Sequence, residues 1–211
     1  MKRQICIFLL ASAAATGACK SAEPAPGTTT APAAEPAATP KATDPASLKT
    51  LELDPAQSKF DFVAAKITKS HNGAFKQYSG TATVVGDDLH SIVVEVETPS
   101  IEADDPKLTG HIKTADFLDV EKFPKATFKS SSVTKKAAPG ATHEVSGALT
   151  LHGVTQQITF PVTVNVTATG VTATGEVTID RQKFGVVYPG MPDDLIKDNV
   201  VLKPSFVFVK K

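Results

Sequence analysis

Residues 145–166 read VSGALTLHGVTQQITFPVTVNV, and this stretch decides the fold class. Apolar residues alternate with polar ones in both of its arms: they are Val145, Leu149 and Leu151 in the first arm and Ile158, Phe160, Val162 and Val164 in the second. Successive side chains of a strand point to opposite faces, so each arm is predicted to be a strand with one apolar face. His152 and Gly153 lie between the arms and are predicted to turn the chain. The stretch therefore predicts an antiparallel β-hairpin.

The same alternation recurs along the chain from residue 51 onward. It predicts further strands at residues 60–64, 78–84, 92–96, 126–133, 171–179 and 200–208. Residues 101–124 break the pattern, and the roughly helical spacing of Leu108, Ile112 and Phe117 predicts a short helix or two helical turns that end at Pro124. About eight strands and one helix predict an all-β fold, either an eight-stranded antiparallel barrel or a two-sheet sandwich.

The composition narrows the function. The chain of 211 residues has a formal net charge of zero, and no stretch combines clustered basic residues with aromatic ones. Nucleic acid is therefore not an expected partner. The only cysteines, Cys6 and Cys19, lie near the N-terminus, so the strand-rich region has no disulfide, thiol nucleophile or cysteine metal ligand.

The N-terminus has the features of an export signal. Lys2 and Arg3 precede an apolar run at residues 5–15 that is too short to span a bilayer, and small residues then lead to Cys19. This order resembles a bacterial lipoprotein signal, in which the cysteine is acylated and becomes the first mature residue. The alternative is ordinary cleavage after the three alanines at 13–15, which leaves Cys19 as a free thiol.

The chain is predicted to have three parts. Residues 1–18 are the signal peptide, residues 19–47 are a disordered tether rich in Ala, Pro and Thr that begins with the acylated Cys19, and residues 48–211 are the barrel domain. Lys20 stands where an aspartate retains lipoproteins in the inner membrane of some bacteria. The expected location is therefore the periplasmic side of the envelope, at the outer membrane.

Three segments together resemble the YceI family of bacterial periplasmic and secreted proteins. They are LTGHIKTADFLDVEKFPKATFKSSSV (108–133), VSGALTLHGVTQQITFPVTV (145–164) and IDRQKFGVVYPGMPDDLIKDNVVLKPSF (179–206), with a looser match at HNGAFKQYSGTATV (71–84). The resemblance covers the whole strand-rich region. It implies a lipocalin-like barrel that binds a polyisoprenoid, with no cofactor beyond that lipid.

The first functional hypothesis is a carrier or store that holds a long isoprenoid, or a similar apolar lipid, in the barrel interior. Each buried methylene contributes roughly 0.8 kcal/mol, so such a ligand needs no catalytic group to bind. The alternative is a non-enzymatic module that binds an envelope protein through the barrel surface. A third hypothesis, an enzyme using His111 with Asp116, ranks below both, and we do not expect an enzyme. Edges left by imperfect closure of the barrel would permit a homodimer.

The candidate ligand-binding residues are apolar side chains of the strands and family-like segments, together with one arginine. They are Phe60, Phe62, Phe117, Phe123, Phe128, Leu149, Leu151, Ile158, Phe160, Arg181, Phe184 and Phe206. The competing interpretation is that the apolar members fill a solid core.

Arg181 falls on the apolar face of its predicted strand, in phase with Val177 and Ile179, where an unpaired guanidinium is costly. We expect it either to meet the polar end of the ligand at the barrel mouth or to pair with a carboxylate, for which the candidates are Asp116, Asp119 and Asp180.

The five histidines are scattered at no metal-ligand spacing. His143 and Glu144 begin like the HExxH motif of zinc proteases, but Gly147 stands where the second histidine is needed. No metal site is therefore expected.

Overall fold

A computed structural model describes residues 48–138 and 140–210, which form one compact unit. The predicted signal peptide, Cys19 and the predicted tether lie outside the described residues. Within the described part, no helix is both long and apolar enough to cross a membrane.

The predicted hairpin is formed by β8 (Ala141–Leu151) and β9 (Val154–Val166). Leu151 pairs with Val154, and the two residues between them, His152 and Gly153, have φ angles of 50° and 73°. Positive φ at both central residues is what a two-residue hairpin turn of type I′ requires. The hairpin and the position of its turn are therefore confirmed.

The other strands and the helices follow in chain order. The strands are β1 (Leu48–Leu53), β2 (Lys59–Ala65), β3 (Ser70–Phe75), β4 (Tyr78–Val85), β5 (Asp88–Glu97), β6 (Ile101–Ala103), β7 (Lys125–Ala138), β10 (Gly170–Gly175), β11 (Val177–Asp180), β12 (Gly190–Met191), β13 (Asp194–Leu195) and β14 (Asn199–Val209). The helices are the 3-10 turns η2 (Thr98–Ser100) and η3 (Arg181–Phe184) and the α-helix α1 (Pro106–Ile112).

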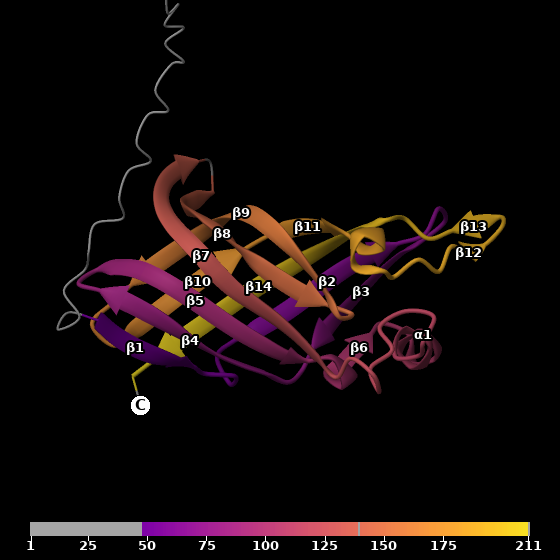
Figure 1. The fold of residues 1–211 in the computed structure, drawn as a ribbon, viewed down its shortest axis with the longest axis horizontal. Helices are drawn as coiled ribbons and strands as arrows, with labels where there is room; N and C mark the ends of the chain where they lie inside the picture. Colours follow the sequence, from indigo (N-terminus) through magenta and orange to yellow (C-terminus); the bar gives the residue numbers. More distant parts are fainter. Residues whose placement is uncertain (1–47, 139, 211) are drawn as a thin grey trace, which may run out of the picture. The chain divides into compact units, whose positions relative to one another are not determined.

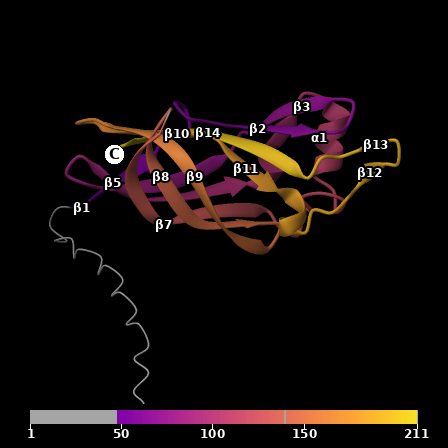
Figure 2. The ribbon, with the colours of Figure 1, turned by 90° about the horizontal axis from the view of Figure 1, so that it is seen from above.

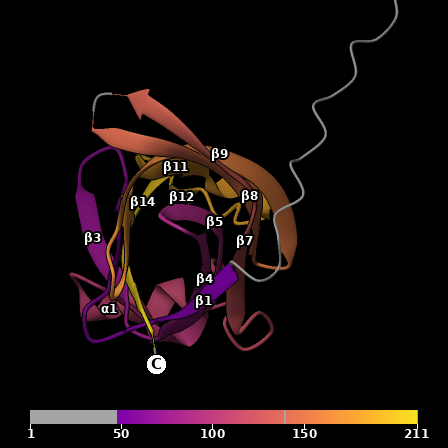
Figure 3. The ribbon, with the colours of Figure 1, turned by 90° about the vertical axis from the view of Figure 1, so that its left-hand side faces the viewer.

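The strands form a closed antiparallel barrel. The wall follows the order β1-β4-β5-β7-β8-β9-β10-β14, and β14 pairs again with β1 through Leu53–Phe208 and Glu52–Val209. Figure 3 looks along the barrel and shows these strands around one axis. The predicted eight-stranded barrel with one α-helix is therefore confirmed, and the two-sheet sandwich is excluded.

Several wall strands are interrupted and continue as a second segment. β1 pairs with β4, and β2 pairs with β3. On the other side of β4 and β3, β5 pairs with β4 and β6 pairs with β3. β10 and β11 both pair with β14 and are separated by Glu176 alone. The first half of β14 thus lies between β11 and β2, and its second half lies between β10 and β1.

One end of the barrel is filled with side chains. Phe208 is completely buried and is the register partner of both Leu53 and Val171, which are 7% and 1% exposed. Burial of an aliphatic or aromatic side chain of this size contributes roughly 1.5–3 kcal/mol. This closed end, next to β1 and the C-terminus in Figures 1 and 2, is a solid core.

The opposite end carries the shorter elements, as both views show. α1, the hairpin tip between β2 and β3, and the β12–β13 hairpin gather there. The helix starts where the sequence places helical spacing, with Asp105 as its N-cap and Pro106 as its first residue. We call this end the rim.

Gly73 permits a close contact in the wall. A Cβ atom added there would lie 2.3 Å from the Phe62 ring and 2.3 Å from the carbonyl oxygen of Glu102. We predict that Gly73→Ala destabilises the domain by roughly 1–3 kcal/mol, because ring and backbone must both move. Gly110→Ala in α1 is the matched control, since nothing lies within 4 Å of its added Cβ. It should leave stability unchanged or raise it by up to about 1 kcal/mol. Urea denaturation measures both changes, and equal effects would contradict the packing.

Candidate ligand-binding cavity

A narrow inner cavity of about 100 Å³ lies inside the barrel. Five rings contribute to its wall: Phe60, Phe75, Phe128, Phe160 and Phe206. The other lining residues come from β5, β7, β8, β9, β10, β11 and β14, and they are Ile92, Val94, Val96, Ala126, Thr127, Val145, Leu149, Leu151, Ile158, Val162, Ala173, Gly175, Val177, Leu202 and Pro204. Thr127 is the only polar residue among them. Apart from Thr127, such a wall offers no side-chain partner to a bound water molecule.

The rings of the inner cavity contact one another. Phe60 stacks on Phe75 with their centroids 5.2 Å apart, and it meets the edge of Phe206 at 5.7 Å. Phe128 on β7 and Phe160 on β9 meet edge to face at 5.7 Å. Such aromatic pairs are weakly directional. The lining therefore presents ring faces and edges, and a ligand would be bound mainly through apolar contacts.

A wider outer cavity of about 390 Å³ lies toward the rim. It shares Phe75, Leu151 and Leu202 with the inner cavity, so the two adjoin. Its other apolar lining residues are Phe62, Ala64, Ala65, Ile101, Leu108, Ile112, Phe117, Leu118, Ile179, Val186, Ile196 and Val200. Its charged or titratable lining residues are Lys66, His71, Asp105, Lys107 and Arg181. The polar groups of the combined cavity therefore lie at one end of it.

Arg181 is only 5% exposed, and its guanidinium is held by the loop that precedes β14. It donates hydrogen bonds to the carbonyl oxygens of Val186 (2.7 Å), Ile196 (3.2 Å) and Lys197 (3.2 Å). Its Nη2 also lies 3.3 Å from a carboxylate oxygen of Asp198. The predicted carboxylate partner is thus found, but it is Asp198 and none of the three candidates. The reason is that β11 ends at Asp180, and η3 turns Arg181 toward this loop.

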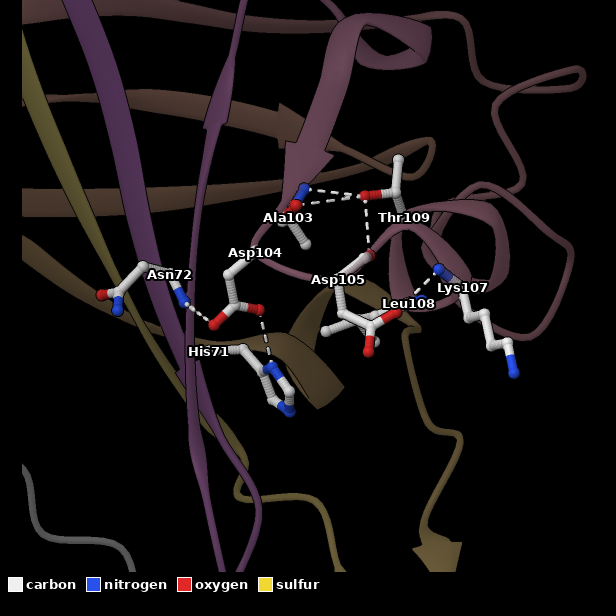
Figure 4. A network of polar contacts seen from close by, with 8 residues as sticks. All are labelled: His71, Asn72, Ala103, Asp104, Asp105, Lys107, Leu108 and Thr109. Atoms are coloured by element: carbon white, nitrogen blue, oxygen red, sulfur yellow. Dashed lines mark hydrogen bonds and ion pairs between the residues drawn. The ribbon is translucent and has the colours of Figure 1, made fainter.

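A polar network fixes α1 against the wall (Figure 4). His71 Nδ1 lies 2.8 Å from a carboxylate oxygen of Asp104, and this hydrogen bond is the main reason that the pKa of Asp104 is lowered. Asp105 accepts hydrogen bonds from the backbone N–H groups of Lys107 (2.7 Å) and Leu108 (3.3 Å), which lower its pKa in the same way. Both carboxylates are therefore ionised at neutral pH, and α1 is a fixed part of the cavity wall.

His111 and Asp116 form the pair that the enzyme hypothesis requires, with 2.8 Å between Nε2 and the carboxylate oxygen. The pair is partly exposed, and the His111 ring packs edge-on against Phe117 and Tyr188. Neither residue belongs to the lining of the two cavities. Among the described residues there is also no cluster of side chains able to hold a metal ion.

Comparison with known proteins identifies the family. The sequence model of the YceI-like domain matches residues 51–208. The chain belongs to the YceI family. A UPF0312 protein of Pseudomonas putida is 36% identical over 129 residues, which are 56% of this chain and 65% of that protein. A UPF0312 protein of Pseudomonas fluorescens is 32% identical over 142 residues, which are 63% of this chain and 72% of that protein.

Two solved structures share the fold of this YceI domain. Burkholderia cenocepacia BcnA superimposes with a TM-score of 0.64 at 27% identity, over 74% of this chain and 98% of BcnA. A polyisoprenoid binding domain from Saccharophagus degradans superimposes with a TM-score of 0.60 at 16% identity, over 78% of this chain and 99% of that domain.

The cavities contain most of the residues that the sequence singles out. Ten of the twelve candidates lie in the lining: Phe60, Phe62, Phe117, Phe128, Leu149, Leu151, Ile158, Phe160, Arg181 and Phe206. Their contact with a ligand stays a prediction.

The remaining two, Phe123 and Phe184, lie outside the lining. Phe123 packs against His152, with ring centroids 4.6 Å apart, beside the β8–β9 turn. Phe184 is 2% exposed and belongs to a separate core cluster with Leu149 and Ile179. Pairing of β9 with β10 ends at Val162, and η3 packs against β9 beyond that point, so Phe184 fills space that strand pairing leaves.

Many lining residues were not among the candidates, and two groups of them show why. Ile92, Val94 and Val96 alternate along a strand that was predicted, so their parity is a signal that could have found them. His71 and Lys107 could not be found from strand alternation. His71 lies on the short β3, and Lys107 lies in the first turn of α1, close to its N-cap.

The bonds of Arg181 lead to a test of the rim. We predict that Arg181→Met destabilises the domain by roughly 3 kcal/mol, because buried carbonyl oxygens lose their donors. Lys183→Met, on the exposed side of η3, should change the free energy of unfolding by less than about 0.5 kcal/mol. Urea denaturation of the two variants gives the comparison, and equal losses would show that the loop does not depend on Arg181.

Proposed function

We propose that this YceI domain binds a long isoprenoid, or a similar apolar lipid, inside its barrel, and that it carries or stores the lipid in the bacterial envelope. The observation that supports this most strongly is the shape of the cavity. An apolar channel begins at a polar rim, narrows between phenylalanine rings and ends at a solid core. Such a channel fits a molecule with one long apolar part and one polar end.

The energetics favour a hydrocarbon in the inner cavity. A polar group placed there would lose its hydrogen bonds to water and find no replacement, at a cost of roughly 1–3 kcal/mol or more. Each methylene transferred from water contributes roughly 0.8 kcal/mol in the other direction, less the cost of ordering the chain. The inner cavity therefore selects for apolar chains without any directional contact.

The depth of the channel limits how much of the lipid is enclosed. Val200 lines the outer cavity and Phe206 the inner one, six residues further along β14. That separation is about 20 Å along the strand and, with the usual tilt of barrel strands, about 15 Å of depth. A longer polyprenyl chain would fold back in the outer cavity or extend past the rim.

The polar end of the ligand is expected at the rim, beside His71 and Lys107. Within the described residues, the ammonium group of Lys107 has no ion-pair partner, whereas Lys66 pairs with Asp194. Arg181 is a weaker candidate, because four hydrogen bonds already occupy its donors.

The export signal and Cys19 extend the proposal to location. We propose that an acyl chain on Cys19 holds the domain at the periplasmic face of the envelope, where isoprenoid lipids are available. The binding role uses no catalytic group, so the pair of His111 and Asp116 has a structural part in it. The choice of an isoprenoid as ligand is supported by the shared fold of the polyisoprenoid binding domain from Saccharophagus degradans.

A cavity-filling variant tests the proposal. We predict that the delipidated domain 48–211 takes up polyprenyl ligands in native mass spectrometry. Ala173→Leu places extra methyl groups in the inner cavity, which should weaken long-chain binding roughly tenfold because about two methylenes of ligand are displaced.

Ala148→Leu provides the matched control. It adds the same atoms on β8 at a residue outside the cavity lining, opposite Lys129 and Gln157. Binding should stay unchanged in this variant, and thermal melts verify that both variants fold. Absence of uptake by the parent domain would refute the proposal, and so would unchanged affinity in Ala173→Leu.

A further inference from the structure

The most exposed large apolar side chains of the described residues gather at the rim. Met191, Val187 and Ile67 are 64%, 63% and 61% exposed, and Leu195 is 44% exposed. They belong to the β2–β3 tip, the β12–β13 hairpin and the loop between η3 and β12, all at one end of the barrel in Figures 1 and 2. Exposed apolar side chains that gather in one place mark an interaction surface more often than scattered ones do.

The two tips are joined, so this surface is a built part of the fold. The backbone N–H of Ile67 donates to the carbonyl oxygen of Leu195 (3.0 Å), and Lys66 and Ile196 form a β-bridge. Asp194 pairs with Lys66 and accepts a hydrogen bond of 2.9 Å from the hydroxyl of Thr68. The fold therefore exposes Ile67 and Leu195 while it holds their backbones in place.

The same segments carry apolar side chains from the cavity to the outside. Val186 lines the outer cavity and its neighbour Val187 is exposed; likewise Ile196 lines the cavity and Leu195 is exposed. Each of these two segments thus carries an apolar side chain in the cavity lining and, next to it in the chain, an exposed apolar one. A lipid leaving the cavity at this point would meet apolar side chains first.

The charged side chains of the two exposed segments are equal in number. Residues 66–69 and 187–198 together hold three lysines, Lys66, Lys69 and Lys197, and three aspartates, Asp193, Asp194 and Asp198. Lys66 and Asp194 pair directly across the two tips. A surface with exposed apolar side chains and no net charge suits the interfacial region of a bilayer, whatever the charge of its lipids. A flat protein partner fits less well, because the apolar side chains stand on separate tips.

We propose that the rim of this domain docks on a phospholipid bilayer by inserting Ile67, Val187, Met191 and Leu195 into its interface. This inference rests on the proposed lipid-binding function and adds the route by which the ligand enters and leaves the cavity. The lipid passes between bilayer and cavity beside these four side chains, without crossing water.

Vesicle flotation of the domain 48–211 tests the docking. The double variant Ile67→Ser/Met191→Ser removes two of the inserted side chains, and its partition onto phosphatidylcholine vesicles should fall roughly tenfold or more. Leu48→Ser/Val93→Ser is the matched control, because both side chains are exposed, at 41% and 39%, but lie on β1 and β5 away from the rim. The control should float like the parent. Adding phosphatidylglycerol should change parent binding by less than about twofold, since the tips carry no net charge.

The outcomes separate docking from lipid binding. Loss of flotation in the rim variant, with polyprenyl uptake retained in native mass spectrometry, supports docking. Equal flotation of rim variant and control overturns the docking and leaves the lipid-binding function standing. A parent domain that binds polyprenyl ligands but no vesicles overturns it too, and then points to a protein partner at the rim. Flotation without any polyprenyl uptake refutes the proposed function, and the route of transfer falls with it.

Discussion

The structure depends on the place of β14 in the wall. Its first half pairs with β11 and β2 and its second half with β10 and β1, so one strand joins the beginning of the barrel to its end. This pairing closes the sheet and leaves no open edge at the join. Eight strands in turn fix an interior that side chains can fill or that one slim ligand can occupy. The size of the inward-facing side chains then decides whether a given part of the interior is filled or hollow.

Side-chain size explains where the barrel is hollow. At the closed end, Phe208 faces Leu53 and Val171, and together they fill the interior. Further toward the rim, Ala173 and Gly175 leave room beside the phenylalanine rings, and the inner cavity lies there. The outer cavity lies beneath α1 and the rim loops, which bring charged groups to its mouth. The barrel thus combines a stable core at one end with a binding space at the other.

The parts of this arrangement that repeat along a strand could be predicted, and the parts that need distant segments could not. Alternation predicted the hairpin and six further strands, because a half-buried strand must alternate. It also placed Arg181 in the interior, but its partners are carbonyl oxygens of a loop whose position no local pattern encodes. Phe184 lies outside the cavity lining for a related reason, since a break in strand pairing creates the space that its side chain fills. His71 reaches the cavity from a short β3, which the sequence did not reveal as a separate strand.

The central claim is that the cavity holds an apolar lipid in the cell. The most direct test is native mass spectrometry of the domain isolated from bacterial cells without detergent, followed by solvent extraction and identification of what is released. The account predicts a mass above that of the polypeptide and an extracted molecule with a long isoprenoid or similar apolar chain. A polypeptide that carries no ligand, and that takes up none from an extract of envelope lipids, would contradict it.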